Sequence, residues 1–227
     1  MEVALIEIRN AKKIYPDGTK ALDGFSFEVK EGEFVAIMGP SGSGKSTLLH
    51  ILGLLDRASE GEYFFDGKNV ETYSDAELAG IRNKKMGFVF QAFNLLSRTP
   101  VLENVKLPLL YSVEPEDKWD ELALKAIKTV GLEHRINHDP SELSGGEKQR
   151  AAIARALVLN PMIVFADEPT GNLDSKSGGQ VMEAIEKLHR AGNTILLITH
   201  ESYTAEYAKR VIHLKDGKIE SDHYFMK

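Results

Sequence analysis

Cysteine and long apolar runs are both absent from this sequence of 227 residues. Without cysteine there is no disulfide, no thiolate metal ligand and no cysteine nucleophile, and a reducing compartment suits the chain. No stretch approaches the roughly 18 consecutive apolar residues of a membrane-spanning helix. Glu2 and Glu7 stand where a secretory signal has basic and apolar residues, so we expect neither a spanning segment nor export by that route.

An excess of positive charge is absent as well. The formal net charge is −6 at pH 7, which gives no field that would concentrate the chain on nucleic acid or anionic lipid. We therefore expect no nucleic-acid partner. Hydrophobic residues make up 42% and charged residues 27%, close to the average of globular proteins, so we expect a chain that folds around a sizeable core.

No internal repeat or Gly/Ser linker divides the chain, and short apolar runs alternate with turn residues and helical patterns. Predicted strands cover 3–8, 25–29, 34–38, 63–65, 86–90, 162–166, 194–199, 210–214 and 218–221, the last two joined by an Asp216-Gly217 hairpin. Predicted helices cover 45–55, 119–130, 145–159 and 177–190. This order favours an α/β fold with a mainly parallel core sheet, a strand-rich N-terminal part and a helical insertion between Gln91 and Pro140.

A glycine-rich loop lies between the predicted strand 34–38 and the predicted helix that follows it. Its residues, which match G-x-x-x-x-G-K-[ST], are Gly39, Pro40, Ser41, Gly42, Ser43, Gly44, Lys45 and Ser46. Glycines let backbone N–H groups turn toward phosphate oxygens, the start of the helix adds a favourable dipole, Lys45 supplies a positive charge and the Ser46 hydroxyl can ligate Mg²⁺. The flanking strand and helix make a turn without a ligand the weaker interpretation.

Two carboxylates, Asp167 and Glu168, end the apolar run 163–166. Because ligands gather at the carboxyl ends of parallel strands, we expect both beside the glycine-rich loop. Neighbouring residues of a strand point opposite ways, which predicts Asp167 directed toward Mg²⁺ and Glu168 toward an attacking water. Alone, such a pair is more often a solvated strand end or a helix cap; beside a phosphate loop, the catalytic interpretation is favoured.

Two single residues and one turn add to this picture. His200 follows strand 194–199, where an imidazole can donate to charge developing on a γ-phosphate, although a lone histidine there is more often structural. Gln91 follows strand 86–90; its amide can reach Mg²⁺ or water, and it could equally be a plain turn residue. Ser144, before Gly145 and Gly146, begins the next helix and forms either a second phosphate site or a capped helix only. Two phosphate-recognising ends in one chain suggest that each nucleotide lies between two copies.

These motifs occur in the order found in the nucleotide-binding subunits of ATP-binding cassette (ABC) transporters, which the chain resembles over essentially its whole length. The positions that match the family are the aromatic Tyr15, the Walker A loop 39–46, the Q-loop Gln91, the signature 143–147, the Walker B pair 167–168, the D-loop 171–174 and the switch His200. Glu147 departs from the commonest signature, which has glutamine at that position.

The resemblance implies a P-loop NTPase core of the RecA-like type, with an N-terminal antiparallel β subdomain and a helical insertion subdomain. Residues 1–227 would form one ABC ATPase domain, its core and β subdomain at 1–90 and 155–227 and its helical subdomain at 92–154. Two copies are expected to pair head to tail around ATP and Mg²⁺. Hydrolysis is then expected to drive an integral membrane permease that is a separate chain.

The same resemblance implies a role for each site residue. Catalysis is expected from Glu168 as general base, together with Lys45, Gln91 and His200. Mg²⁺ is expected on Ser46, Gln91 and Asp167. Contacts to the nucleotide are expected from Tyr15, Gly39, Pro40, Ser41, Gly42, Ser43, Gly44, Lys45, Ser46, Thr47, Ser144, Gly145, Gly146 and Asp174.

Three runs, 51–56, 88–96 and 167–175, are similar to the branch that contains macrolide exporters, lipoprotein-releasing systems and the cell-division ATPase. This branch implies a peripheral protein on the cytoplasmic face of the cell membrane. The alternative is a soluble ABC-type ATPase of DNA maintenance or translation, but the 52 residues 92–143 have no coiled-coil heptads and the chain holds one cassette. A generic P-loop kinase would not explain Ser144 or the carboxylate pair. His134 and His138 could bind a metal if helical, but no third ligand is evident.

Overall fold

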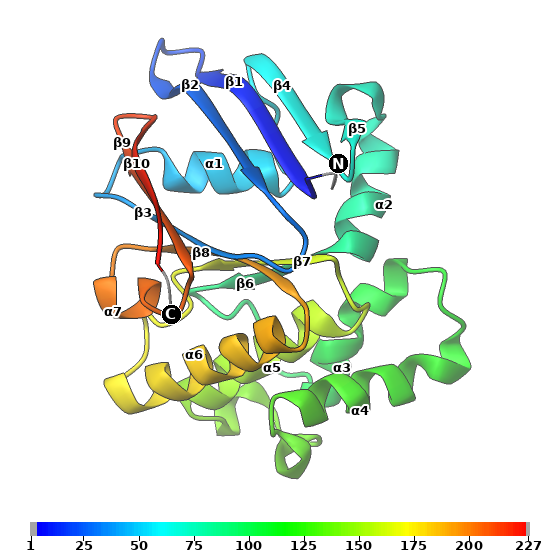
Figure 1. The fold of residues 1–227 in the computed structure, drawn as a ribbon. Helices are drawn as coiled ribbons and strands as arrows, with labels where there is room; N and C mark the ends of the chain where they lie inside the picture. The colour runs from blue at the N-terminus through cyan, green and yellow to red at the C-terminus, as the bar shows by residue number, and fades with distance from the viewer. Residues whose placement is uncertain (1–3, 226–227) are drawn as a thin grey trace.

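The computed structural model describes residues 4–225, which form two sheets and the helices packed around them (Figure 1). Val3, the predicted start of the first strand, lies outside this range. The smaller sheet is antiparallel and has the order β2-β1-β4-β5. Its strands are β1 (Ile6–Ile14), β2 (Lys20–Val29), β4 (Glu60–Phe65) and β5 (Lys68–Asn69).

The larger sheet has the order β10-β9-β3-β8-β7-β6, and all neighbours except β9 and β10 run parallel. Its strands are β3 (Phe34–Met38), β6 (Met86–Phe90), β7 (Ile163–Asp167), β8 (Thr194–Thr199), β9 (Arg210–Lys215) and β10 (Lys218–Tyr224). The predicted α/β fold with a mainly parallel core sheet is confirmed, and β9 and β10 form the hairpin expected at Asp216-Gly217.

Alternating side chains of the larger sheet belong to two separate cores. In β7, Ile163 and Phe165 join the core shared with the smaller sheet and α1 (Lys45–Leu52), whereas Val164 and Ala166 join the core on the opposite face. Figure 1 shows α1 between the two sheets. A strand covered on both faces is apolar throughout, which is why the central strands are clear in the sequence.

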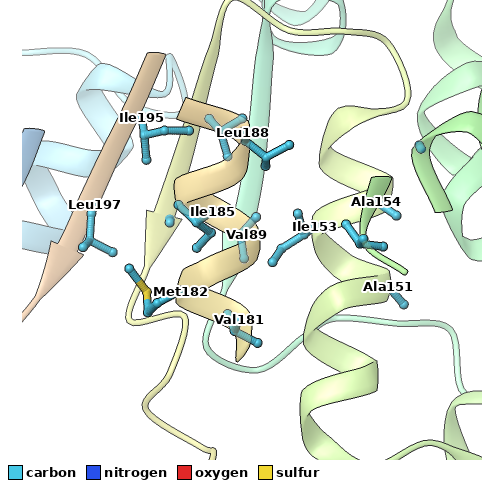
Figure 2. Close-up of a cluster of buried hydrophobic side chains, with 14 of the residues drawn as sticks. Val89, Ala151, Ile153, Ala154, Val181, Met182, Ile185, Leu188, Ile195 and Leu197 are labelled. Atoms are coloured by element: carbon cyan, nitrogen blue, oxygen red, sulfur yellow. The ribbon is translucent and has the colours of Figure 1, made fainter. Parts of the chain in front are cut away.

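The second core lies under the larger sheet, where α5 (Gly145–Leu157) and α6 (Ser175–Arg190) pack (Figure 1). Figure 2 shows its centre, where Ile153 of α5 and Ile185 of α6 gather with Val89 of β6 and Leu197 of β8. The helices α3 (Val101–Lys106) and α4 (Trp119–Thr129) pack against α5 as well. The helix α5 therefore joins the core sheet to the helical segment that precedes it.

The segment 92–154 contains no strand. Besides α3, α4 and most of α5, it holds short 3₁₀ turns: η2 (Leu107–Tyr111), η3 (Glu116–Lys118), η4 (Glu133–Arg135) and η5 (Pro140–Glu142). In α4, Ala123, Ala126 and Ile127 are buried, while Leu122 is half-buried.

The sequence patterns do not predict α2 (Asp75–Lys85), α3, α7 (Ser202–Ala205) or the 3₁₀ turn η1 (Val70–Thr72). In α2 only Leu78 is buried, so the helix carries almost no apolar period. Its start is nevertheless marked by a capping box between Ser74 and Glu77, a signal that sequence alone contains. Within residues 4–225, no helix is both long and apolar enough to cross a membrane.

Candidate functional site

Four parallel strands end at one edge of the larger sheet. The register pairs Met38 with Thr199, Phe90 with Asp167, and Asp167 with Ile198, so β3, β6, β7 and β8 stop at nearly the same level. Open parallel sheets bind their ligands at this edge. The residues that follow these strand ends, Gly39, Gln91, Glu168 and His200, therefore emerge at the same edge of the sheet.

The glycine-rich loop between β3 and α1 needs its glycines for two reasons. Gly42 and Gly44 have φ of +79° and +102°, a left-handed conformation that other residues rarely adopt. Gly39 and Gly44 also pack so tightly that a Cβ atom would collide with the carbonyl oxygens of Leu214 and Ala21, respectively. The loop is thus held in one shape by the β9 end and by β2.

Several polar groups of this loop are free to meet an anion. Lys45 Nζ donates to the carbonyl oxygens of Gly39 at 2.7 Å and Pro40 at 2.9 Å, so its charge lies against the loop itself. Ser43 Oγ is buried and has no hydrogen-bond partner among the described residues. The helix α1 has neither a side-chain cap nor an acidic residue in its first turn. Backbone donors, a helix dipole and a mobile lysine are the requirements of a phosphate site.

Glu168 follows β7 in a turn of unusual conformation, with φ of +46°. Its N–H donates to the carbonyl oxygen of Ile198 at 2.9 Å, and its own carbonyl accepts from Gly171 N at 3.0 Å. The strand ends at Asp167 and Glu168 lies in the left-handed turn, so the strand alternation used in the prediction does not apply to this pair. Such strained residues persist where the surroundings hold them in place, commonly at functional sites.

The carboxylate of Glu168 meets the imidazole of His200. Nδ1 of His200 lies 2.7 Å from Glu168 Oε1, and this hydrogen bond raises the pKa of His200, with the charge of Glu168 adding to the rise. The glutamate side chain is only 16% exposed and the histidine side chain 62%. Glu168 Oε2 is buried without a partner among the described residues. One carboxylate oxygen is therefore held by His200 and the other is left to accept a proton or a water.

Asp167, at the end of β7, lies in a partly buried position beside these groups. Burial raises the pKa of Asp167, the charge of Glu168 adds to that rise, and His50 and Lys45 oppose it. Carboxylate, hydroxyl and amide oxygens are the ligands that Mg²⁺ binds. Asp167, Ser46 and Gln91 are donors of that kind, carried by β7, α1 and the end of β6.

Gln91 pairs with Asn172 of the segment that follows Glu168. Gln91 Nε2 donates to Asn172 Oδ1 at 3.3 Å, and Asn172 Nδ2 donates to the carbonyl oxygen of Gln91 at 3.0 Å. A Cβ atom at Gly171 would lie 2.5 Å from Gln91 Nε2, so a larger residue there would displace the end of the Gln91 side chain. The sequence patterns do not single out Asn172 for this role, because the two partners are 81 positions apart.

Ser144 caps α5 with a reciprocal pair of bonds. Its Oγ accepts from Glu147 N at 3.3 Å, while Glu147 Oε2 accepts from Ser144 N at 2.8 Å. Although burial opposes it, the hydrogen bonds from Ser144 and Arg135 lower the pKa of Glu147 to about 2. Gly145 and Gly146 lie against Leu173 and Ser177. Within the described residues, no hydrogen bond or ion pair joins this turn to the phosphate loop.

The two remaining residues predicted to contact the nucleotide, Tyr15 and Asp174, lie in different places. Tyr15 is half-buried, with its hydroxyl 3.3 Å from Thr47 Oγ1 and Lys13 Nζ 5.5 Å from its ring centre, so it lies next to α1. Asp174 caps α6 by accepting from the N–H groups of Lys176 and Ser177, and hydrogen bonds from the Ser177 side chain and backbone lower the pKa of its carboxyl. Asp174 is thus beside the Ser144 turn and Tyr15 beside the phosphate loop.

His134 and His138 do not form a metal site with a third ligand. No group of three His, Cys, Asp or Glu side chains among residues 4–225 is arranged to hold a metal ion. His134 lies in η4, 3.6 Å from Glu147 Oε1, and His138 Nε2 lies 3.2 Å from Arg135. Both histidines belong to the polar surroundings of Glu147.

The fold and this strand edge define a nucleotide-hydrolysing protein of the P-loop class. A profile of the ABC transporter family matches residues 22–171. Because it covers more than half of the sequence, the chain belongs to the ABC transporter family and carries its ATPase cassette.

Relatives of two lengths are similar to the chain. The macrolide export ATP-binding/permease protein MacB of Chlorobaculum tepidum is 55% identical over 221 residues, which are 96% of this chain and 34% of that protein. An uncharacterised ABC transporter ATP-binding protein of Thermotoga maritima is 48% identical over 219 residues, which are 95% and 94% of the two chains. The chain thus spans about a third of the MacB proteins it matches.

Among solved structures, the cassette MJ0796 of Methanocaldococcus jannaschii, a dimer in a post-hydrolysis state with ADP and phosphate, has a TM-score of 0.88. It is 43% identical, and the match covers 98% of this chain and 99% of that one. The predicted family and the antiparallel smaller sheet beside a parallel core are confirmed.

Proposed function

We propose that two copies of this chain enclose two ATP molecules and that hydrolysis drives a membrane permease of an export or mechanotransmission system. The support for a dimer is the dimeric MJ0796 cassette, and the support for export is the similarity to MacB. The chain would then work at the cytoplasmic face of the membrane as a peripheral subunit. The observation that carries the catalytic part is Glu168, whose second carboxylate oxygen is buried without a partner beside His200.

In this proposal Glu168 is the general base. A carboxylate that takes a proton from water contributes when it lies within hydrogen-bond reach and when its other oxygen is held in place. His200 holds Oε1 and leaves Oε2 for the water. The exposed imidazole can also turn toward a γ-phosphate and donate to its developing charge. Lys45 would exchange its two carbonyl partners for phosphate oxygens, which are stronger acceptors.

The donor set at the strand edge fits Mg²⁺, with Ser46, Gln91 and Asp167 as the residues that would hold it. When bound, the ion neutralises phosphate charge and polarises the phosphoryl oxygens. To reach Mg²⁺, the Gln91 side chain would break its hydrogen bond to Asn172. Binding of the ion would therefore change the contact between the end of β6 and the segment after Glu168. Asp167 keeps one side of the site anionic, and its partial burial strengthens its attraction for a cation.

The nucleotide would lie across two copies. In one copy, Tyr15 would stack on adenine, and the loop 39–46 with Thr47 would hold the phosphates. From the other copy, Ser144, Gly145 and Gly146 would face the γ-phosphate, and Asp174 would position the turn beside them. The exposed position of Ser144 and the separation of its turn from its own phosphate loop support this arrangement.

The surface proposed for the permease is a largely apolar groove of about 730 Å³ lined by α2, β6, η2 and the end of α5. It runs from Leu55 past Phe88 and Phe90 to Tyr111, which is 82% exposed. The MacB relatives are named for an ATP-binding part and a permease, so we propose a short segment of a permease as the occupant. Phe90 lines the groove and directly precedes Gln91. A permease segment bound there would therefore contact the residue next to the hydrolytic site.

Replacing Glu168 by Gln tests the proposal. The amide keeps the shape and cannot accept a proton, so turnover should fall by about 10² to 10⁴-fold. ATP affinity should be retained, and the variant should form a stable dimer with ATP in size-exclusion chromatography. A Glu168→Gln chain that hydrolyses ATP at the wild-type rate would rule out the catalytic assignment.

The permease part has its own test. A tagged Glu168→Gln chain isolated from native membranes should carry an integral membrane protein, and Tyr111→Glu in the same chain should lose it. Glu103→Gln, an exposed change on α3 outside the lining of the groove, is the matched control. If no membrane protein copurifies with either chain, the permease partner is wrong even where the catalytic assignment holds.

A further inference from the structure

A glutamine lies fully buried in α5, a helix whose other buried residues are glycine, alanine and isoleucine. The side chain of Gln149 is 0% exposed, and Ala151, Ala152, Ile153 and Ala154 of the same helix are buried with it. Nε2 of Gln149 donates to two carbonyl oxygens, that of Pro169 at 2.9 Å and that of Phe90 at 3.2 Å. Its Oε1 is buried with no hydrogen-bond partner among the described residues.

Packing alone does not account for glutamine at this position. A buried amide oxygen without a partner costs about 1–3 kcal/mol, and an unbranched apolar residue such as Met would avoid that cost on the same helix face. The two donor bonds are therefore the feature that distinguishes glutamine from an apolar residue of similar length. The role of these two hydrogen bonds depends on which segments the carbonyl groups of Phe90 and Pro169 belong to.

Both carbonyl groups belong to the strand ends of the hydrolytic site. Phe90 is the last residue of β6 and directly precedes Gln91, and Pro169 directly follows Glu168. The pairing of β6 with β7 ends at Phe90 and Asp167, so beyond that point the sheet no longer sets the spacing of the two chains. The planar amide of Gln149, with its two hydrogens, bonds to both segments there, in addition to the pair formed by Gln91 and Asn172.

The helix that carries this amide also carries the signature turn. Ser144 precedes Gln149 by five residues, which in an α-helix is about 7.5 Å along the axis. Farther along α5, Arg155 donates to the carbonyl oxygens of Phe93, at 2.9 Å, and Asn94, both of which have φ above +50°. The helix therefore holds the chain on both sides of Gln91 at the same time as it presents Ser144.

We propose that Gln149 is a positioning residue of the ATPase site, and this proposal rests on the roles given above to Gln91 and Glu168. Its amide holds the backbone next to both residues at one distance from α5. A displacement of Ser144 on engaging the nucleotide of a second copy then reaches the backbone beside both Gln91 and Glu168 through this side chain. In this role Gln149 acts through the two backbone carbonyl groups and does not itself contact the nucleotide.

The test uses Gln149→Met and Gln149→Glu, with Gln180→Met on the exposed face of α6 as the matched control. Gln149→Met keeps the side-chain length and removes both donors. Because misplacement of catalytic groups by about 1 Å costs on the order of 100-fold, kcat should fall about 10- to 100-fold. KM for ATP and the affinity of the single chain for ATP should stay near the wild-type values. The control should leave kcat unchanged.

Gln149→Glu supplies a readout that a purely structural role would not produce. An ionised carboxylate there repels the two carbonyl oxygens, whereas the protonated acid donates one hydrogen bond again. Burial raises the pKa of such a carboxyl, so kcat relative to the wild type should be lowest at high pH and recover as pH falls. Thermal unfolding of each variant shows whether it is folded at the pH of the assay.

Two results would overturn the proposal. One is a folded Gln149→Met chain with wild-type kcat. The other is a Gln149→Glu chain whose kcat, relative to the wild type, does not change with pH. Failure of the proposed function gives a different pattern, because Glu168→Gln would then retain turnover whatever Gln149 does.

Discussion

The molecule has two helix N-termini directed at phosphate in the proposed function, and they are built in opposite ways. The helix α1 begins after Gly44 in a left-handed conformation, with no side-chain cap and no acid in its first turn. The helix α5 begins at Ser144 with a complete capping box and with Glu147 in its first turn. The N-terminus of α1 leaves its backbone N–H groups without a side-chain partner. The N-terminus of α5, at the surface, has a side-chain hydrogen bond from its own capping box.

This difference follows from what each end must bind. A helix N-terminus whose N–H groups have no partner destabilises the fold unless an anion binds there. The N-terminus of α1 keeps this conformation because Gly39, Gly44 and the adjoining strands hold the loop rigidly. The α5 end is exposed and would meet its phosphate only when a second copy arrives, so the capping box stabilises it in the meantime. The comparison therefore separates nucleotide binding by one chain from association of two chains.

The largest expected effect is at the open end. Lys45→Ala removes the one mobile positive charge of the loop, and a charge-assisted bond is worth about 1.5–3 kcal/mol. ATP binding to the single chain should weaken by about 10- to 100-fold in calorimetry. Lys30→Ala, at an exposed position after β2, should bind ATP as the wild type does. Unchanged affinity in the Lys45→Ala chain would count against the phosphate-loop assignment.

The capped end should respond differently. Ser144→Ala removes the cap and should lower the free energy of unfolding by about 1 kcal/mol without changing the affinity of a single chain for ATP. Combined with Glu168→Gln, it should reduce the ATP-dependent dimer seen by size-exclusion chromatography. Ser74→Ala is the matched control, because Ser74 has the same capping box on α2. It should lose similar stability and keep the dimer; equal dimer loss in both variants would remove the distinction between the two ends.

The smallest effect concerns pH at the strand edge between them. The pKa of His200 is raised by Glu168, so the pair stabilises the folded chain fully below the unfolded value of about 6.5 and loses that contribution as pH rises through the raised pKa. In NMR titration, the midpoint of His200 should be lower in Glu168→Gln than in the wild type. An identical His200 midpoint in both chains would show that the contact does not exist in solution.

Local patterns were sufficient for most of the fold. β3, β6 and β8 have the predicted bounds because continuous apolar runs belong to strands covered on both faces. The sequence pattern did not predict α2, because only Leu78 of this helix is buried and the helix therefore has almost no apolar periodicity. At the site, the residue types were visible in the sequence, but the bonds from Glu168 to His200 and from Gln91 to Asn172 join residues 32 and 81 positions apart.

The sequence by itself determined the class of protein, because a phosphate loop, an acidic strand end and a signature turn require particular residues at particular spacings. Only the tertiary structure decided which polar groups have hydrogen-bond partners and which have none. It paired one oxygen of Glu168 and left the other free, and it buried Gln149 across two strand ends. These outcomes depend on burial and on contacts between distant segments, which no local spacing contains.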